Sequence, residues 1–353
     1  MVRRALAALL SATLAMCPPC ALAAAAASQS PASANAGLER LLAAQLARFP
    51  SHSGVYVKNL RTGEEAAVLG DAHFESASTI KLAVMILAFQ LADAGKLDLA
   101  ARYDLKPQDY RAGSGVLRFL DRGARLTTHD LIELMIAASD NTATDIMIGK
   151  VGGPDAVNAF LRRAGYRDLT LNKTVGEHFR WRYEVLDPKY QRLSPEDVFA
   201  LQSNAPAFAI SRQALIASVR AESAARDLDA LVARANTQEG NWLGVVTPRE
   251  LGRMLEAIER DEAASKAACE DMKRMLRAQQ AGQRKIPHFL NVPVAHKTGE
   301  NTGVTHDAGL IYARAGTVVM VSLNTDVTGS IAEADDRIGN LARLMVDYFD
   351  GAR

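Results

Sequence analysis

Ser78 and Lys81 lie three residues apart in the segment FESASTIK, residues 74–81, at the start of an apolar run. The residues that follow, 82–87, predict a buried helix. Positions i and i+3 share one helical face, so the Lys81 amine would lie against the Ser78 hydroxyl. An amine there can accept the hydroxyl proton if burial lowers its pKa, and the helix N-terminus favours a developing anion. The spacing predicts a nucleophilic serine with a lysine base, although the same spacing also arises by chance on exposed helices.

Two further polar motifs lie at the ends of predicted elements. Ser139-Asp140-Asn141 follows an apolar helix, where these residue types ordinarily end a helix. Residues 296–300, HKTGE, end a predicted strand, and Gly299 permits the close backbone approach that amide groups directed at an oxyanion need. Each motif alone has a plain structural explanation, but the three in this order have a low chance of coincidence.

The set SxxK, SDN and KTG resembles the motifs of class A β-lactamases and related penicillin-recognising serine hydrolases. The resemblance covers most of residues 37–350 and includes GGP at 152–154, NAFLR at 158–162 and KIP at 285–287. It implies an α+β fold of the β-lactamase/transpeptidase type. In that fold both chain ends form one antiparallel sheet with flanking helices, a helical lobe lies between them in sequence, and the active site occupies the cleft.

The resemblance assigns catalytic roles to four residues. Ser78 would attack the substrate carbonyl and become acylated, with Lys81 as the base or as a relay through a water. Ser139 would pass a proton to the leaving nitrogen, and Lys297 would act on the Ser139 hydroxyl and the substrate carboxylate electrostatically. A positioned base contributes roughly 10²- to 10⁴-fold to the rate.

The resemblance also assigns substrate-binding roles. Asn141 would hydrogen-bond the amide side chain of the substrate, and Thr298 would help to hold its carboxylate. The backbone N–H groups of Ser78 and Glu300, on either side of the close approach at Gly299, would form the oxyanion hole. One such donor is worth about 10²- to 10³-fold.

The resemblance fails at the residue that releases the acyl group. Class A enzymes carry a glutamate in a loop after the GGP helix, and that position falls on Val175 here. Glu177 is our candidate for the deacylating base and Glu184 is a second, but a solvated loop carboxylate is the better explanation of either residue. The Arg–Asp pair that clamps this loop in the family has no evident counterpart, since Lys173 and Gly244 stand near its places.

The chain is also longer than its family pattern in the same region. An expanded loop insertion is expected at about 178–246, with added helices at 195–201 and 212–234. Glu300 and Asn301 replace the small residues that usually follow KTG, and His306-Asp307 lies near where a carboxylate-binding arginine often sits.

The order of the elements predicts how these motifs come together. A helix at 37–48 and a hairpin at 53–69 open the domain, and apolar runs at 292–297, 308–313 and 318–323 precede a closing helix at 331–349. Almost everything between them has helical patterning. We therefore expect a catalytic domain at 37–350, in which 70–285 is mostly a helical lobe.

The N-terminus has the pattern of a secretory signal. A positive start at Arg3 and Arg4, a short apolar stretch and Ala21-Leu22-Ala23 predict a cleavable signal peptide at 1–23, followed by a flexible segment at 24–36. This predicts a periplasmic or secreted protein with no membrane span in the mature chain. An uncleaved anchor and a lipoprotein signal ending at Cys17 are weaker alternatives.

Composition narrows the partners. Without Arg3 and Arg4 the chain has 39 of its 41 Lys and Arg residues and 40 acidic residues, and this near-zero net charge argues against nucleic-acid binding. After cleavage Cys269 is the only cysteine, so no internal disulfide can form. The histidines lack the spacing of a zinc site. We expect a monomer without metal or cofactor.

Three functions remain open at this stage. The first is β-lactam hydrolysis through an acyl-serine. The second is a penicillin-binding D-Ala-D-Ala peptidase or other amide or ester hydrolase on the same scaffold, acting on a peptidoglycan-like peptide. The third is a binding protein or sensor that is trapped after acylation because it lacks a deacylating base.

Overall fold

The computed structural model describes residues 36–203 and 212–351, which belong to one compact unit, Ser33–Arg353. The predicted signal peptide, 1–23, lies outside the described residues, as does the segment 24–36 except for Ala36, which opens the first helix. In the described part of the chain, none of the helices is both long and apolar enough to cross a membrane.

The elements follow the predicted order along the chain, with most strands near its two ends and most helices between them. The strands are β1 (His52–Asn59), β2 (Glu65–Val68), β3 (Phe74–Glu75), β4 (Arg102–Asp104), β5 (Arg125–Thr127), β6 (Thr170–Leu171), β7 (Gly244–Val246), β8 (Val294–Asn301), β9 (Val304–Ala313) and β10 (Gly316–Thr325). The α-helices are α1 (Ala36–Leu46), α2 (Lys81–Asp93), α3 (Thr128–Ala137), α4 (Asn141–Lys150), α5 (Gly153–Arg163), α6 (Val175–Leu186), α7 (Pro195–Ser203), α8 (Gln213–Ala225), α9 (Leu228–Ala235), α10 (Pro248–Glu259), α11 (Lys266–Arg277) and α12 (Ile331–Asp350). Short 3₁₀ turns include η1 (Ala77–Ile80) and η6 (Glu239–Asn241).

Both ends of the domain share one antiparallel sheet of five strands, in the order β2-β1-β10-β9-β8. Strand β1 pairs with β10 in the register Val55↔Ser322, and β9 pairs with β8 in the register Ala308↔Lys297. Most side chains of β9 and β10 are buried on both faces of the sheet, which requires cover on each side. The predicted α+β fold, with one sheet built from both chain ends, is confirmed.

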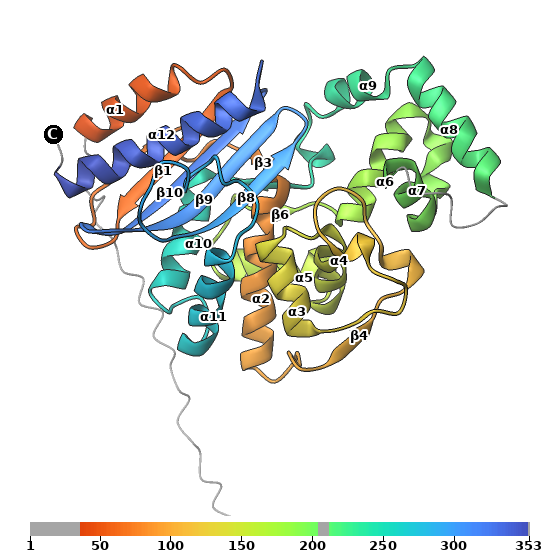
Figure 1. The fold of residues 1–353 in the computed structure, drawn as a ribbon, viewed down its shortest axis with the longest axis horizontal. Helices are drawn as coiled ribbons and strands as arrows, with labels where there is room; N and C mark the ends of the chain where they lie inside the picture. Colours follow the sequence, from red (N-terminus) through yellow and green to blue (C-terminus); the bar gives the residue numbers. More distant parts are fainter. Residues whose placement is uncertain (1–35, 204–211, 352–353) are drawn as a thin grey trace, which may run out of the picture. The chain divides into compact units, whose positions relative to one another are not determined.

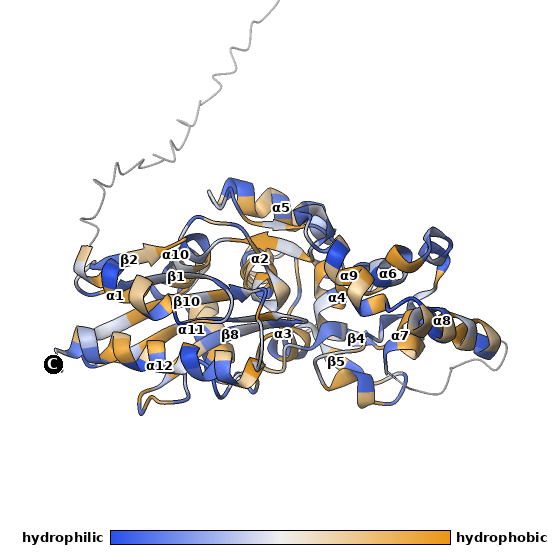
Figure 2. Ribbon diagram, turned by 90° about the horizontal axis from the view of Figure 1, so that it is seen from above, coloured by the Kyte–Doolittle hydropathy of each residue, from blue (hydrophilic) through white to orange (hydrophobic). Residues whose placement is uncertain are grey.

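Helices cover the two faces of this sheet (Figure 1). Helices α1 and α12 pack on one face around a core that includes Leu42, Ile338 and Met345. The other face meets α10, α11 and the helical lobe around α2, whose residues 81–89 are all buried. Figure 2 shows hydrophobic and hydrophilic residues interleaved along α12, as expected for a helix that buries one side only. The site elements therefore sit where the lobe meets the sheet.

Side chains cap the starts of two helices that lead to and from the site, α3 and α10. The Thr127 hydroxyl accepts from the Asp130 amide, and the Asp130 carboxylate accepts from the Thr127 amide, which completes a capping box at α3. At α10 the Thr247 hydroxyl accepts from the Glu250 amide, with Pro248 in the first turn. Both helices therefore begin at a capping threonine.

The region between α5 and α10 is more helical than the sequence indicated. The two added helical stretches are confirmed as α7, α8 and α9. Helix α6 stands where we expected a loop, and its residues pack with α7 and α8 around a separate small core that includes Tyr183, Tyr190 and Val219. The expectation that Glu177 and Glu184 lie in a loop is therefore wrong, because Thr174 and Glu177 form a capping box that starts a helix.

Candidate active site

Ser78 lies in the turn η1, which connects β3 to α2. Strand β3 pairs with β7, a strand at the end of the inserted region, and this pairing fixes the chain directly before the turn. Ala77, directly before the nucleophile, has φ of +40°, a left-handed conformation that costs a non-glycine residue about 1–3 kcal/mol. Such strain accumulates at functional sites and here fixes the backbone that presents Ser78.

Lys81, at the start of α2, is fully buried and directs its ammonium at the SDN motif. Its Nζ donates to Ser139 O at 2.7 Å, to Ser139 Oγ at 3.1 Å and to Asn141 Oδ1 at 3.0 Å. Within the described ranges, the Ser78 hydroxyl makes no side-chain hydrogen bond. Catalytic hydrogen bonds of this kind often tighten only when substrate is bound.

Lys297 approaches the same serine from the sheet. Its Nζ, on β8, donates to Ser139 Oγ at 3.0 Å and to Thr298 O at 2.8 Å. Ser139 itself has φ of +51°, a second left-handed residue at this site, between α3 and α4. The predicted residues Lys81, Ser139 and Lys297 are therefore brought together around one hydroxyl oxygen.

Burial changes the protonation of both lysines. Desolvation lowers the pKa of Lys81 to about 7, with Asp140 and Asp145 opposing the shift. Desolvation also lowers the pKa of Lys297 well below its usual range, and the charges of Lys81 and Lys285 lower it further. A neutral Lys81 amine is thus accessible near neutral pH, which is what a general base requires.

The SDN motif also supports the loop that forms one wall of the site. Asp140 caps α4 through the Ala143 amide at 2.9 Å, and it accepts from Val116 N at 2.7 Å and Leu117 N at 2.8 Å. Asn141 donates to Ala112 O at 3.0 Å. Asp140 is therefore a structural residue, while Asn141 faces the site and tethers the same loop.

The end of β8 passes close to the nucleophile turn. A Cβ added at Gly299 would lie 3.2 Å from Ala77 Cβ and 3.2 Å from Thr79 Cγ2, so only glycine fits without displacement. Glu300 follows, half exposed, and its carboxylate accepts from the fully buried Lys285 at 2.7 Å. Lys285 was not among the predicted site residues, and it neutralises a carboxylate next to the expected oxyanion hole.

A pocket contains Ser78, and we call it the nucleophile pocket. Its lining comes from β3, η1, the segment between β4 and β5, helices α4 and α6, the residue before β7 and the end of β8: Glu75, Ala77, Ser78, Ser114, Asn141, Val175, His178, Phe179, Leu243, Glu300 and Asn301. Among the lining residues, Val175 occupies the place where the family resemblance put a deacylating glutamate. The acidic residues of the lining are Glu75 and Glu300.

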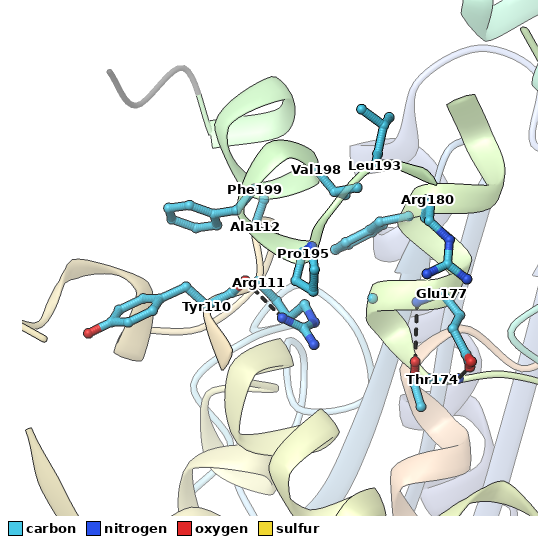
Figure 3. Close-up of a pocket in the computed structure, with 12 residues that line it drawn as sticks. Tyr110, Arg111, Ala112, Thr174, Glu177, Arg180, Leu193, Pro195, Val198 and Phe199 are labelled. Atoms are coloured by element: carbon cyan, nitrogen blue, oxygen red, sulfur yellow. Dashed lines mark hydrogen bonds between the residues drawn. The ribbon is translucent and has the colours of Figure 1, made fainter. Parts of the chain in front are cut away.

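Glu177 lies elsewhere. It is exposed at the third position of α6, where its carboxylate accepts from the Thr174 amide at 2.8 Å. It lines a neighbouring pocket between α6 and α7, together with Phe179, Arg180, Pro195 and Phe199 (Figure 3). Glu184 pairs with Arg180 at 3.0 Å along the same helix. The structure thus brings neither carboxylate into the nucleophile pocket.

A different pair holds α6 in place. Asp145 accepts from Val175 N at 2.7 Å, from Gly176 N at 2.8 Å and from Arg111 Nε at 2.7 Å. This Arg–Asp pair does not come from the positions of Lys173 and Gly244, where the family pair was expected to be missing; Arg111 and Asp145 belong to other segments of the chain.

Two further polar residues of the nucleophile pocket escaped the sequence analysis. Glu75 is buried with its carboxylate held by Asn236 and Asn301, each at 3.0 Å. His178 is buried on α6, and its Nδ1 has no hydrogen-bond partner in the described part of the chain. The place of Glu75 in the sequence, three residues before Ser78, was the one signal that could have pointed to it.

In the described ranges, no three His, Cys, Asp or Glu side chains are grouped as a metal site would require.

Comparisons with known proteins agree with this geometry. The pattern of the β-lactamase enzyme family matches residues 37–349. β-Lactamase VEB-1 of Pseudomonas aeruginosa is 21% identical over 88% of this chain and 89% of its own length. The β-lactamase regulatory protein BlaB of Streptomyces cacaoi is 27% identical over 76% of this chain and 83% of its own.

Solved structures share the fold. A β-lactamase from Sphaerobacter thermophilus superposes with a TM-score of 0.65 at 26% identity, covering 88% of this chain and 96% of that one. An ancestral class A β-lactamase has a TM-score of 0.65 at 22% identity, covering 88% and 99%. A PBP-A mutant, solved as its acyl-enzyme complex with penicillin G, has a TM-score of 0.68 at 20% identity, covering 91% and 99%.

With its motifs gathered in one site and the family pattern spanning nearly all of the described residues, this chain belongs to the β-lactamase enzyme family and is a serine hydrolase of the class A type.

Proposed function

We propose that the protein hydrolyses the amide bond of β-lactams through an ester formed on Ser78. The observation that carries this proposal is the pair of buried lysines, Lys81 and Lys297, whose Nζ atoms lie 3.1 and 3.0 Å from the same Ser139 hydroxyl oxygen. This arrangement supplies a buried base three residues along the chain from the nucleophile and a proton path to the leaving nitrogen.

The acylation step follows from the protonation of these groups. Neutral Lys81 accepts the Ser78 proton as Oγ attacks the lactam carbonyl, directly or through a water. The C–N bond then breaks, and the nitrogen takes a proton from the Ser139 hydroxyl, which Lys81 replenishes. Amide groups of Ser78 and Glu300 stabilise the oxyanion, with Gly299 permitting the close approach of β8.

The substrate carboxylate would be held by Lys297 and Thr298. Both are buried on β8, and an anionic substrate would favour the charged form of Lys297. Asn141, which lines the nucleophile pocket, would bind the substrate's amide side chain. The Glu300–Lys285 pair beside them adds a carboxylate that the substrate must accommodate.

The experiment is steady-state turnover by the full chain of a chromogenic cephalosporin and of a penicillin, with the Ser78→Ala variant as control. We expect multiple turnovers by the wild type and none by Ser78→Ala. Turnover that survives in Ser78→Ala would overturn the scheme. So would a wild-type protein that leaves both β-lactams intact but hydrolyses peptide or ester substrates.

A second candidate is a protein that acylates and releases slowly, as a penicillin-binding peptidase or a sensor would. The observation that favours it is the nucleophile pocket itself, where α6 contributes Val175 and keeps Glu177 in the neighbouring pocket. One equivalent of product followed by a stop, with a persistent covalent adduct, would favour this candidate.

We further propose export to the periplasm or medium after removal of residues 1–23, action as a monomer, and a catalytic domain bounded by residues 37–350. The support is the N-terminal sequence pattern and the extent of the family match. Fractionation of cells and the mass of the mature N-terminus would test the first, and sedimentation the second.

A further inference from the structure

Glu75 is an unusual residue for its position. Its side chain is 2% exposed on the short strand β3, three residues before the nucleophile. Among the described residues, no cation lies within 4 Å of its carboxylate. A buried charge without an ionic partner is expensive, and such groups concentrate at functional sites.

The carboxylate keeps capacity for another donor. Asn236, after α9, donates to Oε2 at 3.0 Å, and Asn301, at the end of β8, donates to Oε1 at 3.0 Å. A carboxylate has about four lone-pair sites, so each oxygen can accept one more hydrogen bond. The two amides orient the carboxylate while leaving it able to accept a proton.

Two unsatisfied polar atoms lie in the same cluster. His178 lines the nucleophile pocket together with Glu75 and Ser78, and its Nδ1 is buried without a partner among described residues. Asn236 Oδ1, on the residue that binds Glu75, is also buried and unpartnered in the described part of the chain. Each orphaned atom costs about 1–3 kcal/mol unless it is hydrated, so the cluster is built to hold water.

We propose that Glu75 is the general base that activates water to hydrolyse the Ser78 ester, and that His178 Nδ1 accepts a hydrogen bond from the same water. This inference rests on the acyl-Ser78 intermediate of the proposed function. Glu75, on the strand before the nucleophile, would provide the carboxylate that α6 does not place in this pocket.

The chemical step balances with these groups. The water oxygen bonds to the ester carbonyl carbon while one of its protons moves to the Glu75 carboxylate. The resulting tetrahedral oxyanion collapses, the bond from carbon to Ser78 Oγ breaks, and Oγ takes the proton that Glu75 returns. The products are the free acid and the Ser78 hydroxyl.

The surroundings suit a base. Burial raises the pKa of Glu75, while the amides of Asn236 and Asn301 and the charges of Arg182 and Lys173 limit the rise. Burial lowers the pKa of His178 to about 4, so its ring stays neutral and can accept a hydrogen bond at neutral pH. The other groups facing Glu75 are His306, which bonds its backbone oxygen, and Glu300.

The test separates acylation from deacylation. The full-length chain is labelled with a fluorescent penicillin, chased with unlabelled penicillin, and followed by intact mass for wild type and Glu75→Gln. We expect the variant to acylate within about threefold of wild type and to lose its acyl group about 10²- to 10⁴-fold more slowly. Glutamine keeps the shape of the Glu75 side chain. If the Asn236 amide flips, its Oδ1 can accept a hydrogen bond from the NH₂ group of the new glutamine.

Controls address a purely structural role for Glu75. Glu250→Gln removes another buried carboxylate whose pKa burial raises, one that accepts from the Arg167 and Asp168 amides away from the pocket, and it should deacylate like wild type. In wild type the deacylation rate should fall with decreasing pH as Glu75 protonates, and this dependence should vanish in Glu75→Gln. His178→Leu should slow deacylation about tenfold, the value of one hydrogen bond.

The outcomes distinguish this inference from the proposal beneath it. Equal deacylation by wild type and Glu75→Gln would overturn the role of Glu75 while leaving the acyl-enzyme intact. A wild-type adduct that never decays would also overturn the role of Glu75. Slow deacylation in Glu177→Gln, with normal deacylation in Glu75→Gln, would do the same. No adduct on the wild-type protein would overturn both proposals.

Discussion

Lys81 and Lys297 direct their ammonium groups at one hydroxyl, and in the described part of the chain neither has a carboxylate within 4 Å. Burying two unpaired cations together is unfavourable, so loss of a proton from one of them relieves both desolvation and repulsion. The low pKa of Lys81, about 7, is therefore a consequence of where the fold places it and a requirement for its role as base.

The first prediction concerns the pH dependence of acylation. Because the base must be neutral, the acylation rate should rise with pH up to about 7 and fall about tenfold per unit below it. Single-turnover acylation by a fluorescent penicillin, measured between pH 5 and 9, checks this. A rate independent of pH in that range would show that Lys81 is not the base.

The sequence predicted which site residues meet only where they belong to short motifs with a defined spacing. Lys81, Ser139 and Lys297 meet as predicted because each belongs to a motif whose spacing reports its place on a helix, loop or strand. Glu75 and His178 could not be found in that way, because their partners Asn236, Asn301 and Asn241 come from distant segments. A single sequence does not reveal which remote side chains share a pocket.

Among the elements, α6 departs most from expectation. It replaces a loop because Thr174 and Glu177 form a capping box, a Thr-x-x-Glu pattern that was visible in the sequence. Its first two amides are held by Asp145, which also binds Arg111. This clamp sets where Val175, His178 and Phe179 face the nucleophile pocket.

We predict that Asp145→Ala destabilises the protein by about 3–5 kcal/mol, since it removes the buried carboxylate that accepts from the part-buried Arg111 guanidinium and from two backbone amides. Urea unfolding monitored by circular dichroism measures the change. The matched control is Asp71→Ala, which breaks the exposed pair with Arg249 and should cost about 0–1 kcal/mol. Equal losses in the two variants would contradict the clamp.

For the molecule as a whole, the order of strands, then helices, then strands predicted the five-stranded sheet, because apolar β-branched runs at both ends need each other as partners. The three-stranded sheet β3-β7-β6 was not predictable. Its strands have two or three residues, too few to show a period, and they pair because the fold brings them together.

Global stability should carry the signature of the buried lysine. In the unfolded chain Lys81 has a pKa of 10.5 and in the folded chain about 7, so between these values the unfolded state binds more protons. Stability should therefore increase with pH in this window. The penalty is complete below about pH 7.

Replacing Lys81 with methionine removes that dependence. The unfolding free energy of wild type minus that of Lys81→Met should rise by about 1 kcal/mol per pH unit between pH 7 and 9.5. Urea titrations of both proteins at several pH values measure it. A constant difference would mean that Lys81 is charged in the folded protein throughout.

The central claim is that Ser78 becomes acylated, and intact-protein mass spectrometry with peptide mapping tests it most directly. Full-length protein quenched in acid soon after mixing with penicillin G should gain the mass of one penicillin on the peptide that contains Ser78, and Ser78→Ala should gain nothing. An adduct on any other residue, or none on wild type at any time, would contradict the account.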